Sequence, residues 1–210
     1  MSIKVKICGM KYPENMEEVG FLQPDFFGFI FYDKSPRFFE GSIPNIDKSI
    51  LKVGVFVNAT FEEIEEKVNQ FQLDLVQLHG EETPEFCFKI ENKLVKVIKA
   101  LSLHNKFNFN SLNKFKKSCS YFLFDTKGKK YGGNGKSFNW NILENYSLDK
   151  PYFLSGGIGL ENTTDLKEFL KKEYTKKCYA IDLNSKFEIE PGLKDTTTLK
   201  DFFRYIKQQL

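Results

Sequence analysis

Residues 121–140, YFLFDTKGKKYGGNGKSFNW, contain the pattern from which the fold of this chain can be read. The stretch opens with four apolar residues, the composition of a buried strand, and one acid, Asp125, stands where this run stops. A polar loop rich in glycine and lysine follows. A carboxylate at the end of a buried strand, facing a mobile cationic loop, suits a general acid beneath a lid that closes on an anionic substrate. The alternative is that Asp125 caps a turn and the loop only connects two elements.

Similar apolar runs recur along the chain, and segments with helical features separate them. Thr60 and Glu63 have the spacing of a capping box, and Pro13 and Pro84 each suit the first turn of a helix. The expected strands are 3–8, 25–31, 51–57, 73–79, 94–100, 121–125, 151–155 and 178–183. The expected helices are 13–22, a short one in the forties, 61–71, one from 84, 107–117, 138–145, 162–172 and 198–210.

This alternation predicts the fold class. Apolar strands separated by helices indicate βαβ units and a parallel sheet. Eight such units in 210 residues predict an α/β protein with a (β/α)8 TIM barrel, as a single domain over residues 1–210. The alternative is a doubly wound sheet, which usually has fewer strands and a glycine-rich turn after the first. Here Cys8-Gly9-Met10 is not part of a GxGxxG motif, and no Pro/Ser-rich linker divides the chain.

Composition limits the possible partners. Lys+Arg 31 against Asp+Glu 28 gives a net charge of only +3, and the lysines are scattered, so no nucleic acid partner is expected. The N-terminal apolar run is too short for a signal peptide, and no run approaches the ~18 residues of a membrane span, which predicts a soluble, cytoplasmic protein with no membrane partner. The four cysteines form no CxxC pair, which fits a reducing cytosol; with two isolated histidines, no metal site is expected.

In a barrel of this kind the active site lies at the carboxyl ends of the strands, so polar residues there are the candidates. They are Cys8, His79, Lys99, Asp125, Ser155 and Asp182, with Arg37 in the second loop. The last two strand ends usually bind phosphate. Gly156 and Gly157 precede a helix, and Asn184, Ser185 and Lys186 follow the last strand, so two neighbouring loops can offer backbone donors and a helix dipole. The alternative is that these glycines only form turns.

Cys8 differs from the other cysteines because it lies at the mouth of the predicted barrel. A buried cysteine is usually an inert apolar side chain, and Cys87, Cys119 and Cys178 are expected to be of this kind. Lys6 lies two residues before Cys8, points to the same face and is expected to lower the pKa of the thiol. A thiolate there can act as a base or a nucleophile. His79 and Lys99 either contact substrate or make structural hydrogen bonds.

The motifs of the chain, from about Lys4 to Asp195, follow one another as in phosphoribosylanthranilate isomerases. They are KICGM, GFIFYDKSPR, VGVFVN, VQLHGEE, the FD that ends the sixth strand, GGNGKSFNW, LSGGIGLEN and IDLNSKFEIEPGLKD. This resemblance implies a barrel enzyme of tryptophan biosynthesis that is a monomer or a homodimer. It also implies a cofactor-free Amadori rearrangement of a small phosphosugar substrate, N-(5-phosphoribosyl)anthranilate, to 1-(2-carboxyphenylamino)-1-deoxyribulose 5-phosphate.

The resemblance also implies roles for individual residues. Asp125 matches a general acid that protonates the furanose ring oxygen, so that the ring opens to a Schiff base. Cys8 matches a base that removes the C2′ proton, giving an enolamine that tautomerises to the ketone. Arg37 matches the residue that holds the anthranilate carboxylate. The remaining matches are two substrate-binding residues, His79 and Asp182, the latter contacting the opened sugar or ordering a loop, and four phosphate-binding residues, Gly156, Gly157, Asn184 and Ser185.

Three positions depart from the family pattern. Asn134 stands where Thr is usual and is expected to alter the lid, while Asn139 replaces Asp and is expected only to change a helix cap. Lys186 stands where Gly is frequent. It costs roughly 1 kcal/mol or more if the backbone there needs a positive φ, or else it adds a phosphate-facing charge.

Two rival functions remain compatible with the phosphate loops. One is another phosphosugar enzyme: an epimerase, disfavoured by the lack of metal-ligand histidines, or indole-glycerol-phosphate synthase, disfavoured by a missing lysine-rich catalytic set and N-terminal extension. The other is a non-catalytic phosphosugar-binding module, which would need neither Cys8 nor Asp125.

Overall fold

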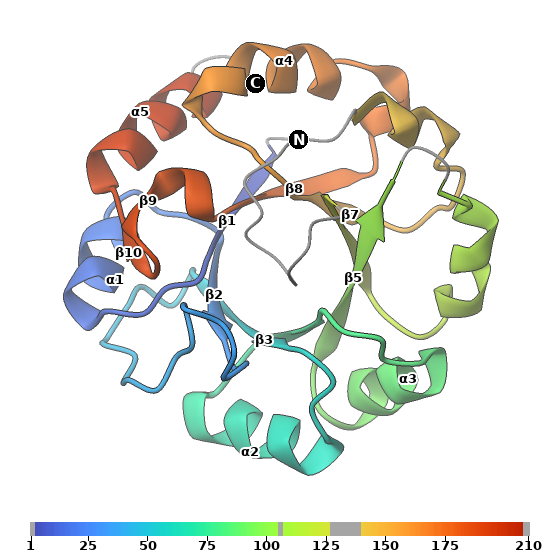
Figure 1. The fold of residues 1–210 in the computed structure, drawn as a ribbon, viewed down its shortest axis with the longest axis horizontal. Helices are drawn as coiled ribbons and strands as arrows, with labels where there is room; N and C mark the ends of the chain where they lie inside the picture. Colours follow the sequence, from blue (N-terminus) through green and yellow to red (C-terminus); the bar gives the residue numbers. More distant parts are fainter. Residues whose placement is uncertain (1–2, 105–106, 127–139, 208–210) are drawn as a thin grey trace.

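The computed structural model describes residues 3–104, 107–126 and 140–207. Eight parallel strands form a closed barrel in which each pairs with its neighbour in sequence, and β1 pairs with β8 to complete the ring (Figure 1). The strands are β1 (Lys4–Cys8), β2 (Phe26–Ile30), β3 (Leu51–Phe56), β4 (Leu75–Leu78), β5 (Lys96–Leu103), β6 (Tyr121–Thr126), β7 (Tyr152–Leu154) and β8 (Cys178–Leu183). The predicted TIM barrel is confirmed.

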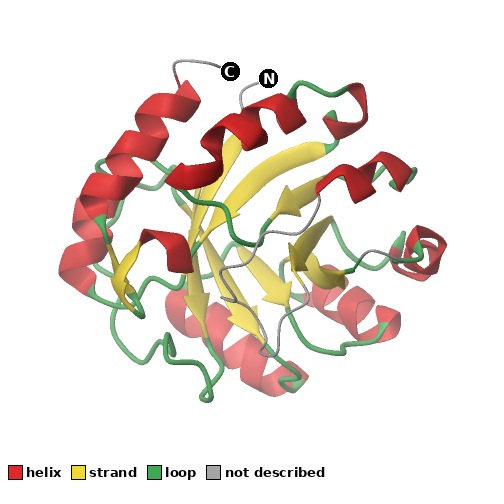
Figure 2. Ribbon diagram, turned by 45° about the horizontal axis from the view of Figure 1, so that its top comes forward, coloured by secondary structure: helices red, strands yellow, loops and turns green. Residues whose placement is uncertain are grey.

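Helices surround the barrel, and a small antiparallel hairpin lies outside it beside α1 (Figures 1 and 2). The α-helices are α1 (Pro13–Gly20), α2 (Phe61–Phe71), α3 (Pro84–Lys93), α4 (Thr163–Leu170) and α5 (Thr196–Lys207). The 3-10 helices are η1 (Phe109–Phe115), η2 (Trp140–Asn145), η3 (Leu160–Asn162), η4 (Glu173–Thr175) and η5 (Ser185–Phe187). The hairpin strands are β9 (Glu188–Glu190) and β10 (Leu193–Lys194). Among the described residues, no helix is both long and apolar enough to cross a membrane.

The predicted helix starts are confirmed where local chemistry defines them. Thr60 Oγ1 accepts a hydrogen bond from Glu63 N at 3.2 Å, and Glu63 Oε2 accepts one from Thr60 N at 2.7 Å, which completes the capping box of α2. Thr83 caps α3, which begins with Pro84.

Three helix predictions need correction, and one of them is the helix expected over 138–145, whose described part is a 3-10 helix at Trp140–Asn145. The expected helix in the forties is wrong, because residues 41–48 are extended or irregular; Pro44 lacks an N–H and disfavours helical backbone at the residue before it. The helix expected over 107–117 is a 3-10 helix at Phe109–Phe115. Asn108 accepts a hydrogen bond from Asn110 N at 3.1 Å through its side chain, and such local bonds compete with the regular α-helical pattern.

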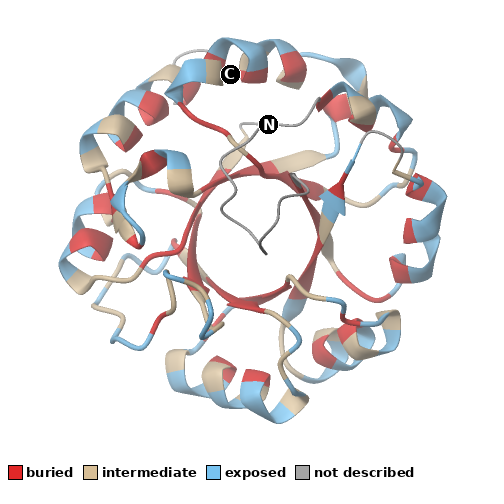
Figure 3. Ribbon diagram, viewed as in Figure 1, coloured by how far each residue is buried: buried red, intermediate tan, exposed pale blue. Residues whose placement is uncertain are grey.

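Apolar side chains fill the inside of the barrel in one cluster, and a second, larger cluster lies between the strands and the helices. The strands are buried almost throughout, whereas the helices expose their outer faces (Figure 3). The inner cluster consists of Phe26, Val53, Leu75, Ile98, Ala100, Leu123, Phe153 and Ala180. These residues lie in the amino-terminal parts of their strands or near the middle, so polar side chains toward the carboxyl ends are left to form a site.

Candidate active site

The residues predicted to form the site lie around one pocket at the carboxyl ends of the strands. Nine of the candidates line this pocket, namely Cys8, Arg37, His79, Asp125, Gly156, Gly157, Asp182, Asn184 and Ser185. Ser155 and Lys186, also singled out in the sequence, line the same pocket. Gln77, which sequence reasoning missed, does so as well. Lys99, another strand-end candidate, lines a different groove.

Cys8 is the last residue of β1, and two glycines make room around it. Gly28 is its neighbour on β2, and a Cβ at Gly28 would lie 2.9 Å from Cys8 Sγ. Gly9 has a φ of +78°, and a Cβ there would lie 2.8 Å from Cδ of Arg37 and 3.0 Å from Oδ1 of Asn184. A side chain at either position would therefore crowd its neighbours, and the positive φ at Gly9 is a backbone conformation that suits glycine.

The pKa of the Cys8 thiol is raised, contrary to the expectation that Lys6 makes it low. Burial is the largest effect and raises the pKa, while the charges of Lys6 and Lys194 lower it by less. The expectation failed because it considered the nearby cation and not the burial of the thiol. The two cations still offset part of the cost of forming a thiolate.

Lys6 is fully buried and forms an ion pair across the β1–β8 seam. Its Nζ lies 2.8 Å from Asp182 Oδ1 and donates a second hydrogen bond to Gln77 Oε1 at 2.9 Å. Burial acts to lower the pKa of Lys6, but the charges of Asp182 and Cys8 outweigh it and the pKa is raised. Ser155 Oγ donates to the other oxygen of Asp182 at 3.2 Å. Asp182 therefore connects β1 with the start of the Gly156–Gly157 loop.

His79 lies between Gln77 and Asp125. Its Nε2 is 3.6 Å from Asp125 Oδ2, and its Nδ1 is 2.9 Å from Gln77 Nε2. Asp125 is 5% exposed and Gln77 is 1% exposed. The signal for Gln77 was present in the sequence, because residues two apart on a strand share a face and a glutamine on a buried face needs polar partners.

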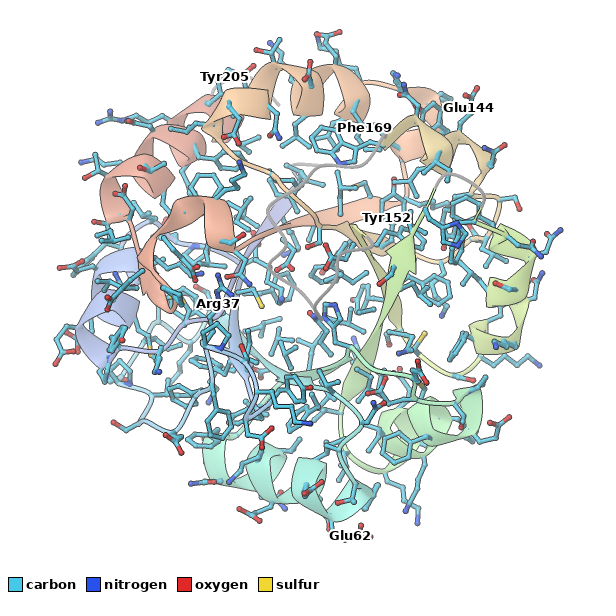
Figure 4. All side chains as sticks on the ribbon, in the orientation of Figure 1. Arg37, Glu62, Glu144, Tyr152, Phe169 and Tyr205 are labelled. Carbon is cyan, nitrogen blue, oxygen red and sulfur yellow. The ribbon has the colours of Figure 1, made fainter. Side chains whose placement is uncertain are left out.

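Arg37 extends toward the hairpin, where a carboxylate holds it (Figure 4). Its Nε lies 2.9 Å from Oε1 of Glu188, and its Nη2 lies 2.6 Å from Oε2. Lys194 Nζ donates to the same Glu188 at 2.7 Å and to Asn184 Oδ1 at 2.8 Å. Burial acts to raise the pKa of Glu188, but the two cations hold it below its usual value. Arg37 and Lys194 thus share the single carboxylate of Glu188. The group keeps a net positive charge, which favours the binding of an additional anion beside it.

Sequence reasoning missed Glu188 and Lys194. Both belong to the FEIEPGLKD stretch of the sequence. Their contacts with each other and with Arg37 depend on the docking of the β9–β10 hairpin, which the sequence alone does not show.

The two predicted phosphate loops lie side by side. Gly156 and Gly157 have φ of +93° and +68°, which is left-handed backbone that suits glycine. Within the described part of the chain, neither of their N–H groups donates a hydrogen bond to another group. Asn162 Nδ2 donates to Gly157 O at 2.7 Å and so pins the loop to the start of the following helices.

Lys186 joins these loops, since its Nζ lies 2.6 Å from Oε1 of Glu161. Positive φ at non-glycine residues of the described chain occurs at Gln23, Asn58 and Gln72, so the strain considered for Lys186 is not present. Asn134, Asn139 and the lid predicted after Asp125 lie outside the described residues.

Lys99 has a structural role beneath the loop that carries His79. Its Nζ donates to Gly80 O and to Glu82 Oε2, both at 2.7 Å, and to Leu78 O at 3.1 Å. Of the two alternatives for Lys99, these contacts support structural hydrogen bonding. Among residues 3–104, 107–126 and 140–207, no group of three or more His, Cys, Asp or Glu side chains is placed to hold a metal ion.

A buried thiol, a buried carboxylate and two glycine- or serine-containing loops share one pocket at the mouth of the barrel, where the active sites of (β/α)8-barrel enzymes lie. Comparison with known proteins gives the family. The family model for N-(5′-phosphoribosyl)anthranilate (PRA) isomerase matches residues 5–205. The chain belongs to this family, so the resemblance and the prediction of an enzyme are confirmed.

Individual relatives align with this chain along nearly their whole length. The N-(5′-phosphoribosyl)anthranilate isomerase of Parabacteroides distasonis is 43% identical, over 96% of this chain and 92% of the relative. The solved phosphoribosyl anthranilate isomerase from Thermotoga maritima superposes with a TM-score of 0.83 at 32% identity, over 98% and 99% of the two chains. A further isomerase structure, in complex with reduced 1-(o-carboxyphenylamino)-1-deoxyribulose 5-phosphate, has a TM-score of 0.81 at 30% identity, with the same coverage.

Proposed function

We propose that this chain converts N-(5′-phosphoribosyl)anthranilate to 1-(2-carboxyphenylamino)-1-deoxyribulose 5-phosphate, as a step of tryptophan biosynthesis that needs no metal or cofactor. The observation that carries the proposal is that Cys8 and Asp125 share one pocket with Arg37 and the Gly156–Gly157 loop. The complex of a related isomerase with a reduced form of that product supports a phosphosugar as the occupant.

Asp125 acts first, as the general acid. It gives its proton to the furanose ring oxygen while the bond from that oxygen to C1′ breaks and the nitrogen lone pair forms the C1′=N bond. The products of this step are an open-chain Schiff base that is protonated at nitrogen and an Asp125 carboxylate. The position of Asp125 at the end of β6, inside the pocket, is what suits it to this role.

Cys8 acts second, as the base. Its thiolate takes the proton from C2′, and the electrons of that C–H bond move into the Schiff base to give an enolamine. The enolamine then tautomerises to the ketone, so the reaction is a rearrangement with no net oxidation. Lys6 and Lys194 favour the thiolate electrostatically, against the larger effect of burial.

The anionic ends of the substrate have separate sites in this proposal. Glu188 holds Nε and Nη2 of Arg37, which leaves Nη1 for the anthranilate carboxylate. The phosphate binds to the backbone N–H groups of Gly156 and Gly157 and to the Asn184–Ser185 loop. Asp182 orders the Gly156–Gly157 loop through Ser155, which directly precedes it.

A cytoplasmic location fits a biosynthetic step of this kind and the four free cysteines. The assembly is a monomer or a homodimer. A related Thermotoga maritima enzyme is described both as dimeric and as engineered monomers.

The test follows the fluorescence loss of freshly generated phosphoribosylanthranilate with wild type, Cys8→Ala and Asp125→Asn. We expect each variant to lose about 10² or more in kcat while still binding a reduced product analogue. Cys119→Ala, which removes a buried thiol outside the pocket, is the matched control and should keep its kcat. A wild type that binds the analogue without turnover would instead favour the non-catalytic binding module.

A further inference from the structure

Polar side chains from four strands form a continuous row across the mouth of the barrel. Asp182 on β8 pairs with Lys6 on β1 at 2.8 Å, and Lys6 reaches Gln77 on β4 at 2.9 Å. Gln77 in turn contacts His79 at 2.9 Å, and His79 lies 3.6 Å from Asp125 on β6. The row therefore connects the surroundings of the proposed base to the proposed acid.

Donor and acceptor chemistry gives this row one direction. The ammonium group of Lys6 has only donors, so the Gln77 atom that faces it is the carbonyl Oε1. The amide nitrogen of Gln77 must then face His79, and since it is a donor, Nδ1 of His79 is the acceptor. A neutral imidazole that accepts at Nδ1 carries its hydrogen on Nε2, which is the atom nearest Asp125.

We propose that Lys6 and Gln77 are positioning residues that hold His79 as the neutral Nε2–H tautomer, and that this N–H stabilises the Asp125 carboxylate formed after protonation of the ring oxygen. The proposal rests on the role of Asp125 as the general acid. The 3.6 Å separation exceeds a hydrogen bond, and such catalytic contacts often tighten when the substrate is bound.

The position of the hydrogen matters because only hydrogen on Nε2 gives the Asp125 carboxylate a donor from this ring. Hydrogen on Nδ1 would place an N–H against the amide nitrogen of Gln77. Rotating that amide by 180° would relieve this contact, but it would place the same NH2 group against the ammonium of Lys6. Both arrangements put donors against donors, so the row favours hydrogen on Nε2.

Lys99 of β5, which lines the groove beside His79, is itself paired with Glu82 of the loop after β4 at 2.7 Å. The amide of Gln77 lies at hydrogen-bond distance from Nδ1 of His79, so Gln77 is the contact that decides which ring nitrogen carries the hydrogen.

The test uses Gln77→Glu, which has nearly the same shape but offers two acceptors. One carboxylate oxygen can accept from Lys6 and the other from an Nδ1–H of His79, so this variant favours hydrogen on Nδ1. Nitrogen-15 NMR of the imidazole rings reads the tautomer directly. The chain has two histidines, and the exposed His104 is the internal control.

We expect wild-type His79 to show the Nε2–H tautomer at neutral pH. In Gln77→Glu we expect hydrogen on Nδ1, with the His104 signals unchanged. The variant should lose about 10-fold or more in kcat, with KM changed less. His79→Gln, which keeps an amide donor at the reach of Nε2, should retain more kcat than His79→Leu.

An imidazolium or an Nδ1–H tautomer in the wild type at neutral pH would overturn the proposal, as would a Gln77→Glu variant whose His79 signals do not move. The NMR readout does not depend on turnover. An Nε2–H tautomer in a wild type without isomerase activity would support the positioning of His79 and refute the proposed function.

Discussion

At the scale of single residues, the contacts of Cys8 differ from what its neighbours in sequence suggest. Lys6 shares its face of the strand, but the ammonium group of Lys6 is bonded to Asp182 and Gln77. The thiol is buried, and burial outweighs both nearby cations. Cys8 therefore holds its proton in the ligand-free protein and becomes a base only as a minor thiolate form.

This state of Cys8 gives a prediction about pH. The difference in thiolate absorbance near 240 nm between wild type and Cys8→Ala should appear only above pH 9.0, the ordinary value from which the pKa of Cys8 is raised. Cys87, Cys119 and Cys178 do not interfere at neutral pH, because their pKa values are raised to about 12, about 11 and about 12. A midpoint at about pH 7 would contradict the dominance of burial over the two cations.

At the scale of elements, the β9–β10 hairpin carries part of the site although it lies outside the barrel. Asn15 of α1 donates to Lys194 O at 2.9 Å and accepts from Lys194 N at 2.8 Å, which docks the hairpin on α1. Glu188 on the hairpin then holds Arg37. The hairpin is therefore the element that sets the direction of the guanidinium group.

Removing the charge of Glu188 tests this role of the hairpin. Glu188→Gln leaves the buried Lys194 and the partly buried Arg37 without their carboxylate, so we expect a loss of about 3–5 kcal/mol in the free energy of unfolding in urea. In the folded variant, KM for the substrate should rise about 10-fold and kcat should change less, because Arg37 is no longer held in place. Glu190→Gln, on an exposed residue of the same hairpin, is the control. Equal KM values for the two variants would contradict the role of Glu188.

The elements also show what can be predicted from sequence. Strand 121–126 and its seven counterparts were predictable because buried parallel strands are continuous apolar runs. The positions of Cys8, His79 and Asp125 around one pocket could be expected from the strand ends, since the barrel brings these ends to one mouth. Lys99 was expected there by the same rule, but it makes structural hydrogen bonds beneath the loop that carries His79. The partners Gln77 and Glu188, the high pKa of Cys8 and the 3-10 form of η1 were not predicted. They depend on burial and on long-range or competing hydrogen bonds, which a local pattern does not contain.

At the scale of the whole molecule, the residues that stabilise the inside of the barrel and the residues proposed for the chemistry lie at different depths of the barrel. Phe153 belongs to the inner apolar cluster and has ring contacts with Phe26 at 5.4 Å, Tyr121 at 5.6 Å and Tyr179 at 5.7 Å between centroids. None of these four residues lines the pocket that contains Cys8. Their packing therefore supports the barrel without touching the proposed chemistry.

This separation predicts that Phe153→Ala lowers the free energy of unfolding by about 3–5 kcal/mol. In conditions where the variant is folded, its kcat should stay within about two-fold of the wild-type value. Urea unfolding and the isomerase assay measure the two effects separately. Phe88→Ala is the control, because Phe88 is 51% exposed and its loss should cost within about 0.5 kcal/mol. A large drop in kcat for folded Phe153→Ala would show that the packing of the inner apolar cluster affects the pocket at the mouth.

The ion pair between Lys6 and Asp182 joins residues that are 176 positions apart. A ribosome adding roughly 5–20 residues per second needs about 9–35 s to synthesise the chain between them. During that interval Lys6 has no Asp182 to pair with, and its charge is best accommodated by water. Burial of the Lys6 ammonium group away from water is therefore favoured only after β8, which carries Asp182, has been synthesised. In the cell, the site is completed only after β8 has been synthesised, when the last strand of the barrel joins the first.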